Sequence, residues 1–247
     1  AQYIPVEHQT PPPEGLEGKT LYMLDFVYPR ETTKRLAETN EKIVIIDHHT
    51  LAYKAIQSMF RDRISKHKNI ETIGNNDVSG AVLAWQYFHP KKPVPQIAKY
   101  VEDADLWKFD LPHSKEISAV IDDENHNFKN WSALAKKIQS PKTKKEVVKK
   151  GGIILEHKRR VIGKIVSKAK EVKWMGHKVK VINSPVFPSE IGNELVEHGG
   201  ADIGVIWYDD NKKIKVSLRS KSSSKVNVAK IAEKYGGGGH KAAASFR

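Results

Sequence analysis

Hydrophobic and polar positions along the first part of the chain follow an alternating series of strand and helix patterns. Residues 19–26 and 41–49 are short, largely apolar runs typical of buried strands, and residues 29–40 between them have the polar-faced pattern of a helix. A strand, a helix and a second strand within about thirty residues indicate a βαβ unit with parallel strands. Residues 77–90 and 93–112 then predict further helices. We therefore expect an α/β fold with a parallel sheet in the N-terminal part.

The pattern changes twice in the second part of the chain. Residues 130–173 predict one or two helices, with Gly151-Gly152 as a candidate break. After residue 176 strand patterns return, including a hairpin within residues 201–220, and a smaller α/β domain is expected there. The predicted parts are an N-terminal domain over residues 1–130, a helical connector over 131–175 and a C-terminal domain over 176–247, with a cleft between the two domains.

Polar residues stand where the two predicted N-terminal strands end. The segment VIIDHHT runs from an apolar strand directly into Asp47, His48 and His49, and Asp25 ends the strand before it. Because the carboxyl ends of parallel strands meet at one edge of a sheet, we expect these four side chains to be neighbours. Burying a carboxylate and imidazoles is costly unless something pairs with them, and a divalent metal ion would do so. The alternatives are a solvated loop for the triplet and a turn cap for Asp25.

A second pair of carboxylates, Asp103 and Asp105, lies near the end of a predicted helix. Residues two apart cannot share one helix face, so we expect one of them to point toward the site and leave open which. The chain has no cysteine, so a metal ion would be held by nitrogen and oxygen donors. This donor set favours harder ions such as Mn²⁺ or Mg²⁺.

Composition adds a preference for anionic partners. The formal net charge is +13, from 42 basic and 29 acidic residues, which favours association with polyanions. Lysines gather in residues 136–150 and 156–173, where solvated helix faces are the plain alternative. Apolar residues make up 39% of the chain, enough for a core, yet no run approaches the roughly 20 residues of a membrane span. With no pattern typical of a signal peptide, we expect a cytoplasmic protein without a membrane partner.

The segment GGGGHKAAASF, residues 236–246, is a candidate anion-binding element. Glycines free the backbone to bring amides close to a phosphate, and an arginine in the upstream segment SLRS could bind phosphate through two hydrogen bonds. The alternative is a flexible tail beside an ordinary strand arginine. The candidate substrate-binding residues are Arg219, Ser220, Gly237, Gly238, Gly239 and His240.

Four features together resemble the DHH phosphoesterases, and more narrowly the DHH–DHHA1 architecture. They are VIIDHH (44–49), Asp25 at a strand end, VEDADLW (101–107) and the terminal GGGGHKAAASF. RecJ-type single-strand exonucleases and the oligoribonucleases called nanoRNases share this architecture, and exopolyphosphatases and cyclic-dinucleotide phosphodiesterases are more distant. The resemblance covers nearly the whole chain.

The resemblance implies roles for the N-terminal residues. Two Mn²⁺ ions would activate a water at the edge of the sheet, with Asp25 bridging them and His48 as a ligand. Asp47 would stand in the same cluster, and His49 would lie near the scissile phosphate. Asp105 best matches the remaining metal ligand of the family, with Asp103 as the alternative; these are the predicted metal and catalytic residues.

The resemblance also implies roles for the C-terminal domain and for the whole chain. Arg219, the glycine run and His240 would hold the nucleotide, with the substrate in the cleft between domains. The implied activity is a metal-dependent phosphodiesterase that hydrolyses short single-stranded RNA or DNA to nucleoside monophosphates. The alternatives are a non-catalytic or weakened member that binds single-stranded nucleic acid or a nucleotide, and a phosphohydrolase of a cyclic dinucleotide, polyphosphate or nucleoside bisphosphate.

One family feature lacks a counterpart in this sequence. The first motif of the family, a strand followed by a histidine and one or more aspartates, would lie upstream of residues 19–26, and His8 lacks the matching spacing. We favour a truncated form over an inactive member, and expect these 247 residues alone to bind Mn²⁺ weakly and to turn over slowly. A homodimer is compatible with the sequence.

Overall fold

The computed structural model describes residues 1–6, 10–49, 69–125, 127–211 and 213–247. The chain divides into two compact units, Ala1–Gly152 and Ile153–Arg247, and the division falls inside the long helix α7 (Pro141–Val166). The segment that the sequence suggests as a connector is therefore shared between the units. None of the helices in the described ranges combines the length and the apolar character needed to cross a membrane.

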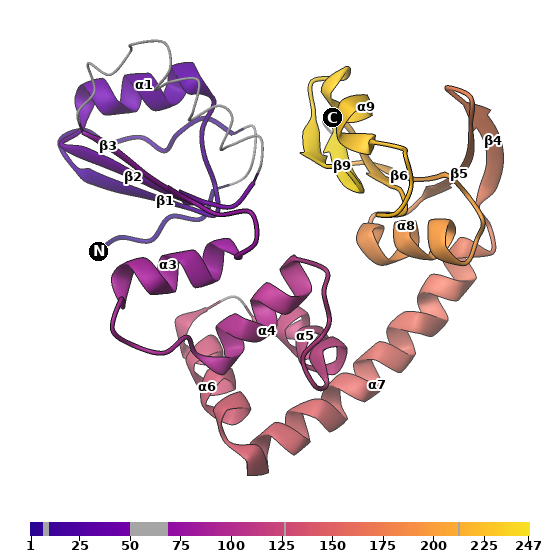
Figure 1. Ribbon diagram of the computed structural model, residues 1–247, viewed down its shortest axis with the longest axis horizontal. Helices are drawn as coiled ribbons and strands as arrows, with labels where there is room; N and C mark the ends of the chain where they lie inside the picture. The colour runs from indigo at the N-terminus through magenta and orange to yellow at the C-terminus, as the bar shows by residue number, and fades with distance from the viewer. Residues whose placement is uncertain (7–9, 50–68, 126, 212) are drawn as a thin grey trace. The chain divides into compact units, whose positions relative to one another are not determined.

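The first unit is built on a parallel sheet of three strands, in the order β1-β2-β3. The central strand is buried from Ile43 onward because helices cover both faces. Ile43 and Ile45 pack with residues of α1 on one side, and Val44 and Ile46 pack against Leu83 of α3 on the other. Figure 1 shows α1 above the strands and α3 below them. The elements are β1 (Thr20–Leu24), α1 (Arg30–Thr39), β2 (Lys42–Asp47), β3 (Ile70–Gly74), α3 (Gly80–Phe88), α4 (Gln96–Asp105), α5 (Ser114–Asp123), α6 (Phe128–Gln139) and the start of α7.

The glycine pair in α7 does not break the helix, contrary to the prediction. α7 runs without interruption from Pro141 to Val166, although glycine is a poor helix former. Gly151 is buried against α5, where a Cβ atom would lie 1.9 Å from the backbone oxygen of Glu116. The glycine therefore permits a close approach of two helices, and the packing gained there offsets its poor propensity.

The second unit contains a mixed sheet of six strands, in the order β4-β5-β6-β7-β9-β8. α8 packs on one face around Ile191, Leu195 and Ile206, and α9 packs on the other around Ile203 and Leu218 (Figure 1). The elements are β4 (Lys170–Trp174), β5 (His177–Asn183), α8 (Pro188–Glu197), β6 (Ile203–Asp209), β7 (Ile214–Arg219), α9 (Val228–Glu233), β8 (Gly238–His240) and β9 (Ala243–Phe246).

The sequence patterns predicted the hairpin of the second unit correctly but not its first strand. The expected hairpin within residues 201–220 is the antiparallel pair β6 and β7. The expectation of a helix to residue 173 is wrong at its end, because β4 is a strand that pairs with β5 across Met175 and Gly176. Both turn residues have positive φ, 51° and 79°, as tight two-residue hairpins require. The predicted fold class, a parallel α/β unit followed by a smaller α/β unit, is confirmed.

Candidate metal centre

The candidate metal centre lies at the carboxyl edge of the parallel sheet. β1 and β2 run in register, with Leu24 beside Ile46, so the residues that follow the two strands emerge side by side. The backbone amide of Asp25 donates to the Ile46 carbonyl at 2.8 Å. Asp25 itself has a positive φ of 54°, which turns the chain sharply away from the sheet at this point.

Four side chains from three parts of the chain converge there. His48 Nε2 lies 3.3 Å from Asp25 Oδ1 and 3.3 Å from Asp105 Oδ2, and His49 Nδ1 lies 3.8 Å from Asp25 Oδ1. Asp25, His48 and His49 each offer a ligand atom, and these atoms all lie within 4.8 Å of one another. Asp105, the last residue of α4, reaches the same histidine from a different element. We call these four residues the edge cluster.

The edge cluster combines a buried histidine with partly exposed carboxylates. The His48 side chain is 3% exposed, whereas those of Asp25 and Asp105 are 50% and 38% exposed. Burial raises the pKa of the Asp25 carboxyl above its ordinary value; His49 opposes this rise and the nearby Asp105 adds to it. A carboxyl group whose pKa is raised by burial and by a neighbouring carboxylate is a favourable ligand for a cation, because the cation offsets that repulsion.

Asp47 supports the edge cluster by holding His49. Its Oδ1 accepts hydrogen bonds from the His49 backbone amide at 3.0 Å and from His49 Nδ1 at 2.7 Å. Burial alone would raise the pKa of Asp47, but these bonds outweigh it and lower the pKa. The same side-chain bond raises the pKa of His49. Asp47 and His49 therefore form a hydrogen-bonded carboxylate–imidazole pair, in which Asp47 orients the ring and favours its protonation.

The first turn of α3 makes room for the edge cluster. A Cβ atom at Gly80 would lie 2.4 Å from Asp25 Oδ1 and 2.7 Å from its Cβ and Cγ. The backbone amide of Ser79 donates to Glu102 Oε2 at 3.0 Å, and Ser79 Oγ caps the helix by accepting from Val82. Sequence reasoning did not single out Gly80 as a spacer, since its neighbour in space lies far away in the sequence, nor Glu102, although the acidic run EDAD contained it.

Of the two carboxylates left open by the sequence, Asp105 lies in the edge cluster and Asp103 does not share its contacts. Asp103 is 5% exposed, and its two carboxylate oxygens accept the backbone amides of Asp110 and Leu111 at 2.9 and 3.0 Å. Burial alone would raise the pKa of Asp103, but the hydrogen bonds it accepts outweigh burial and lower the pKa. The Asp103 carboxylate thus stabilises the loop that follows α4, whereas Asp105 contacts His48.

That loop has an unusual backbone. Trp107, Phe109 and His113 have φ values of 56°, 54° and 61°, a left-handed region that costs residues with a Cβ atom about 1–2 kcal/mol each. The backbone oxygen of Asp103 accepts amides from Lys108 and Phe109 at 2.9 and 3.1 Å, which holds the loop in this shape. The hydrogen bonds of one buried aspartate therefore maintain a strained loop directly after Asp105.

In the second unit, the strand register brings two predicted substrate-binding residues together. Arg219 of β7 and His240 of β8 both pair with Ala243 of the strand between them. Residues paired across antiparallel strands share a face, so both side chains project from the same side of the sheet. Arg219 also donates to Ser189 Oγ of α8 at 2.7 Å. Burial lowers the pKa of Arg219, and Glu190 opposes this shift.

Residues 184–247, which include Arg219 and His240, match the model of the DHHA1 domain family. We refer to this matched part of the chain as the DHHA1 domain. The match confirms the predicted resemblance for the C-terminal part.

One relative matches this chain over nearly its whole length. The uncharacterised protein R106 of Acanthamoeba polyphaga mimivirus is 26% identical over 264 aligned residues, which take in 99% of this chain and 58% of that protein. The chain thus spans little more than half the length of this relative.

Solved structures provide two further similarities. An exopolyphosphatase-related protein from Bacteroides fragilis has a TM-score of 0.44 and 16% identity, over 92% of this chain and 66% of that one. A pGpG-specific phosphodiesterase from Vibrio cholerae has a TM-score of 0.40 and 16% identity, over 93% and 92%. Since both TM-scores lie below 0.5, we infer neither activity nor substrate from them.

The glycine run of the DHHA1 domain forms a tight hairpin, and steric contacts explain its composition. A Cβ atom at Gly237 would lie 2.1 Å from the Ser245 oxygen, and Gly239 has a φ of 144°. Gly238, Gly239 and His240 pair with β9. The segment is therefore part of the sheet, and the flexible tail considered as an alternative is excluded.

Ser220 of the DHHA1 domain has a structural position. It is 6% exposed, its amide donates to the Ala242 oxygen at 3.0 Å, and its Oγ lies within 3.4 Å of the Val226 oxygen. These contacts join the end of β7 to the segment before α9 and to the loop before β9. Arg219, at the preceding position, is thereby held in register with His240.

The donor chemistry of the edge cluster fits a hard divalent cation. It offers two imidazoles and two carboxylates, and the chain contains no cysteine thiol. Mn²⁺ and Mg²⁺ prefer such oxygen and nitrogen donors.

Proposed function

We propose that this chain is a divalent-metal-dependent phosphoesterase of the DHH–DHHA1 type. The observation that carries the proposal is the convergence of Asp25, His48, His49 and Asp105 at the carboxyl edge of a parallel sheet. Such edges are where α/β proteins build their sites. The DHHA1 domain in the same chain supports this assignment.

Asp25, His48 and Asp105 would hold the cation, Mn²⁺ in our proposal, with two ions in the complete site. When bound, the ion supplies Lewis acidity toward a phosphoryl oxygen and toward water. Asp47 keeps the His49 ring oriented through its 2.7 Å hydrogen bond and favours the protonated form. His49 is then suited to donate a hydrogen bond to a phosphate oxygen, or a proton to the leaving oxygen.

We propose short single-stranded oligonucleotides as the substrate, cleaved to nucleoside monophosphates. Arg219 and His240 pair with the same residue of β9 and lie on the same face of the sheet, which supports a phosphate-binding surface in the DHHA1 domain. The net charge of +13 favours a polyanionic substrate over a neutral one. Cyclic dinucleotides, polyphosphate and nucleoside bisphosphates are the competing phosphate compounds.

A second candidate function is binding of single-stranded nucleic acid without hydrolysis. The basic surplus favours it, and α6 and α7 carry exposed lysines on the first unit: Lys129, Lys136, Lys137, Lys142, Lys145 and Lys149. Such binding weakens steeply as salt rises, whereas hydrolysis requires the metal ion.

The test is hydrolysis of a 5′-labelled dinucleotide and of a longer oligomer with Mn²⁺, with Mg²⁺ and with a chelator. We expect mononucleotide products with Mn²⁺ and none with the chelator. Asp25→Asn and Asp105→Asn should abolish both turnover and Mn²⁺ binding, since each removes a charged ligand. Asp110→Asn is the matched control, because it makes the same chemical change in the loop that follows Asp105 and should leave both properties intact.

The outcomes separate the candidates. Turnover of tripolyphosphate or a cyclic dinucleotide in place of the oligomers would keep the phosphoesterase and change its substrate. Salt-sensitive binding of oligomers without metal-dependent turnover would favour the second candidate. Equal activity in Asp105→Asn and Asp110→Asn would refute the proposed metal centre.

A further inference from the structure

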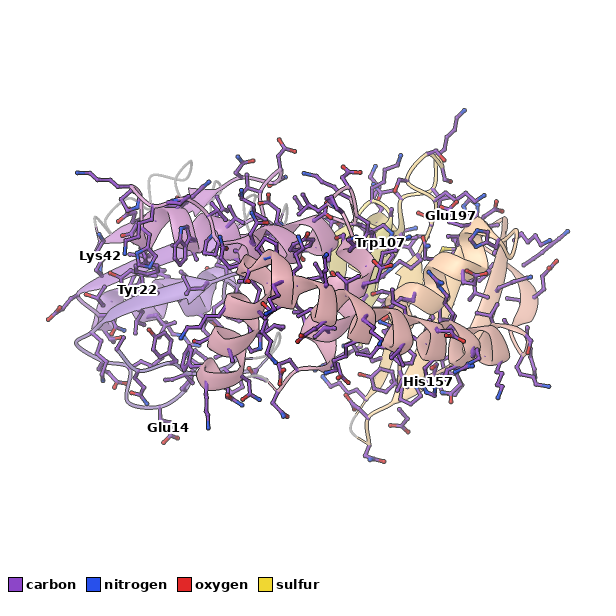
Figure 2. All side chains as sticks on the ribbon, turned by 90° about the horizontal axis from the view of Figure 1, so that it is seen from below. Glu14, Tyr22, Lys42, Trp107, His157 and Glu197 are labelled. Atoms are coloured by element: carbon purple, nitrogen blue, oxygen red, sulfur yellow. The ribbon has the colours of Figure 1, made fainter. Side chains whose placement is uncertain are left out.

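The loop after Asp105 presents an exposed tryptophan close to the edge cluster. Trp107 is 47% exposed, and its side chain is labelled in Figure 2. It follows Asp105 by two positions, and Asp105 Oδ2 lies 3.3 Å from His48 Nε2. Because two residues span at most about 7 Å of chain, the Trp107 backbone lies within that distance of Asp105. This is comparable with the separation of base and phosphate in one nucleotide.

The fold keeps this tryptophan in a costly conformation. A bulky aromatic residue at a φ of 56° is a genuine outlier, and a half-exposed ring recovers little of the cost by burial. The strain is maintained by Asp103, whose carboxylate and carbonyl together accept four amides of the loop. Strain of this kind is concentrated at ligand sites, where the surrounding structure over-determines it.

Neighbouring side chains support the indole ring. Phe109 lies edge-on to it, with ring centroids 5.1 Å apart and planes at 78°. The ammonium of Lys115 lies 5.5 Å from the Phe109 ring centroid. An aromatic surface with a cation nearby suits a ligand that is both planar and anionic.

We infer that Trp107 stacks on the base of a nucleotide whose phosphate lies at the edge cluster. The inference rests on the proposed function and narrows its substrate class, since it favours a phosphate ester that carries a base over inorganic polyphosphate. Stacking of one base on an aromatic side chain corresponds to about 5- to 150-fold in affinity. It tolerates any base, because every base has a π face.

The test compares binding of adenosine 5′-monophosphate with binding of ribose 5-phosphate by calorimetry, in the presence of Mn²⁺. The native protein and Trp107→Phe should bind the nucleotide at least about fivefold more tightly than the sugar phosphate. Trp107→Ala and Trp107→Gly should bind the two ligands alike, with affinity for ribose 5-phosphate unchanged. Phe128→Ala, which removes another exposed aromatic ring, is the control and should keep the preference.

Trp107→Gly separates binding from folding. Glycine adopts a positive φ without strain, so this variant should resist denaturant at least as well as the native protein while losing the base preference. The inference is overturned if the native protein binds both ligands equally or not at all, or if Trp107→Gly keeps the preference. A retained preference in a protein that hydrolyses no phosphate ester would refute the proposed function and leave the role of Trp107 standing.

Discussion

Gly80→Ala probes whether the first turn of α3 maintains the metal centre. The added Cβ atom would lie 2.4 Å from Asp25 Oδ1 and 2.7 Å from Asp25 Cβ. These separations fall about 1 Å short of ordinary contact, and overpacking of this kind costs about 1–3 kcal/mol. The Asp25 Cβ atom cannot yield by a rotamer change, because its position is set by the backbone. We expect Asp25 to be displaced from the edge cluster.

Two opposing contributions decide the stability of the variant. Alanine is favoured over glycine within helices by at most about 1 kcal/mol, so the clash should leave Gly80→Ala less stable by up to about 2 kcal/mol. Gly152→Ala is the matched control, since a Cβ atom there meets nothing within 4 Å. That substitution should stabilise the protein by as much as about 1 kcal/mol.

The decisive measurements are Mn²⁺ affinity by calorimetry and stability by denaturant titration. Displacement of Asp25 should lower the affinity of Gly80→Ala about 10- to 100-fold. In an Asp25→Gly background the clash partner is absent, so Gly80→Ala should change sign and become stabilising. Native Mn²⁺ affinity in Gly80→Ala, or the same stability change in both backgrounds, would refute the reasoning.

Three further predictions address the surrounding structure. Asp103→Asn should lower stability by about 1–3 kcal/mol, because charge-assisted bonds to the loop are weakened; an unchanged denaturation midpoint would contradict this. Asp47→Asn should lower the pKa of His49, measured by NMR without metal. In the native protein the pKa of His49 is raised above 6.5. The stability that the Asp47–His49 interaction contributes is therefore complete below pH 6.5 and is lost as pH rises through the folded-state pKa. Equal His49 pKa values in the native protein and in Asp47→Asn would argue against this interaction. Gly151→Ala should destabilise the protein, opposite in sign to Gly152→Ala, and equal effects on thermal unfolding would oppose the proposed helix contact.

Elements with a strong local pattern were predictable from the chain alone. The apolar run at Val44–Ile46 indicated a buried strand, and the hairpin within residues 201–220 followed from two strand patterns around a polar turn. β3, with the sequence IETIG, has a weak pattern and is only half buried, so its place beside β2 depends on pairing. β4 was assigned to a helix because its charged residues fit either structure.

The candidate site also combines residues that the sequence alone could identify with residues whose roles depended on the tertiary structure. The sequence brought Asp47, His48 and His49 to attention because they adjoin one another at a strand end. It left Asp103 and Asp105 as alternatives, since spacing alone does not reveal a loop that turns back to bond one of them.

By itself, the sequence determined the chemistry that is available: nitrogen and oxygen donors without thiols, a basic surplus, and the periodicities that form individual strands and helices. These are properties of single residues and of near neighbours along the chain. The tertiary structure alone decided that Asp105, and not Asp103, reaches His48, that Gly80 must lack a side chain, and that Arg219 and His240 pair with the same residue of β9. The reason is that distances between remote side chains are set by strand register and helix packing.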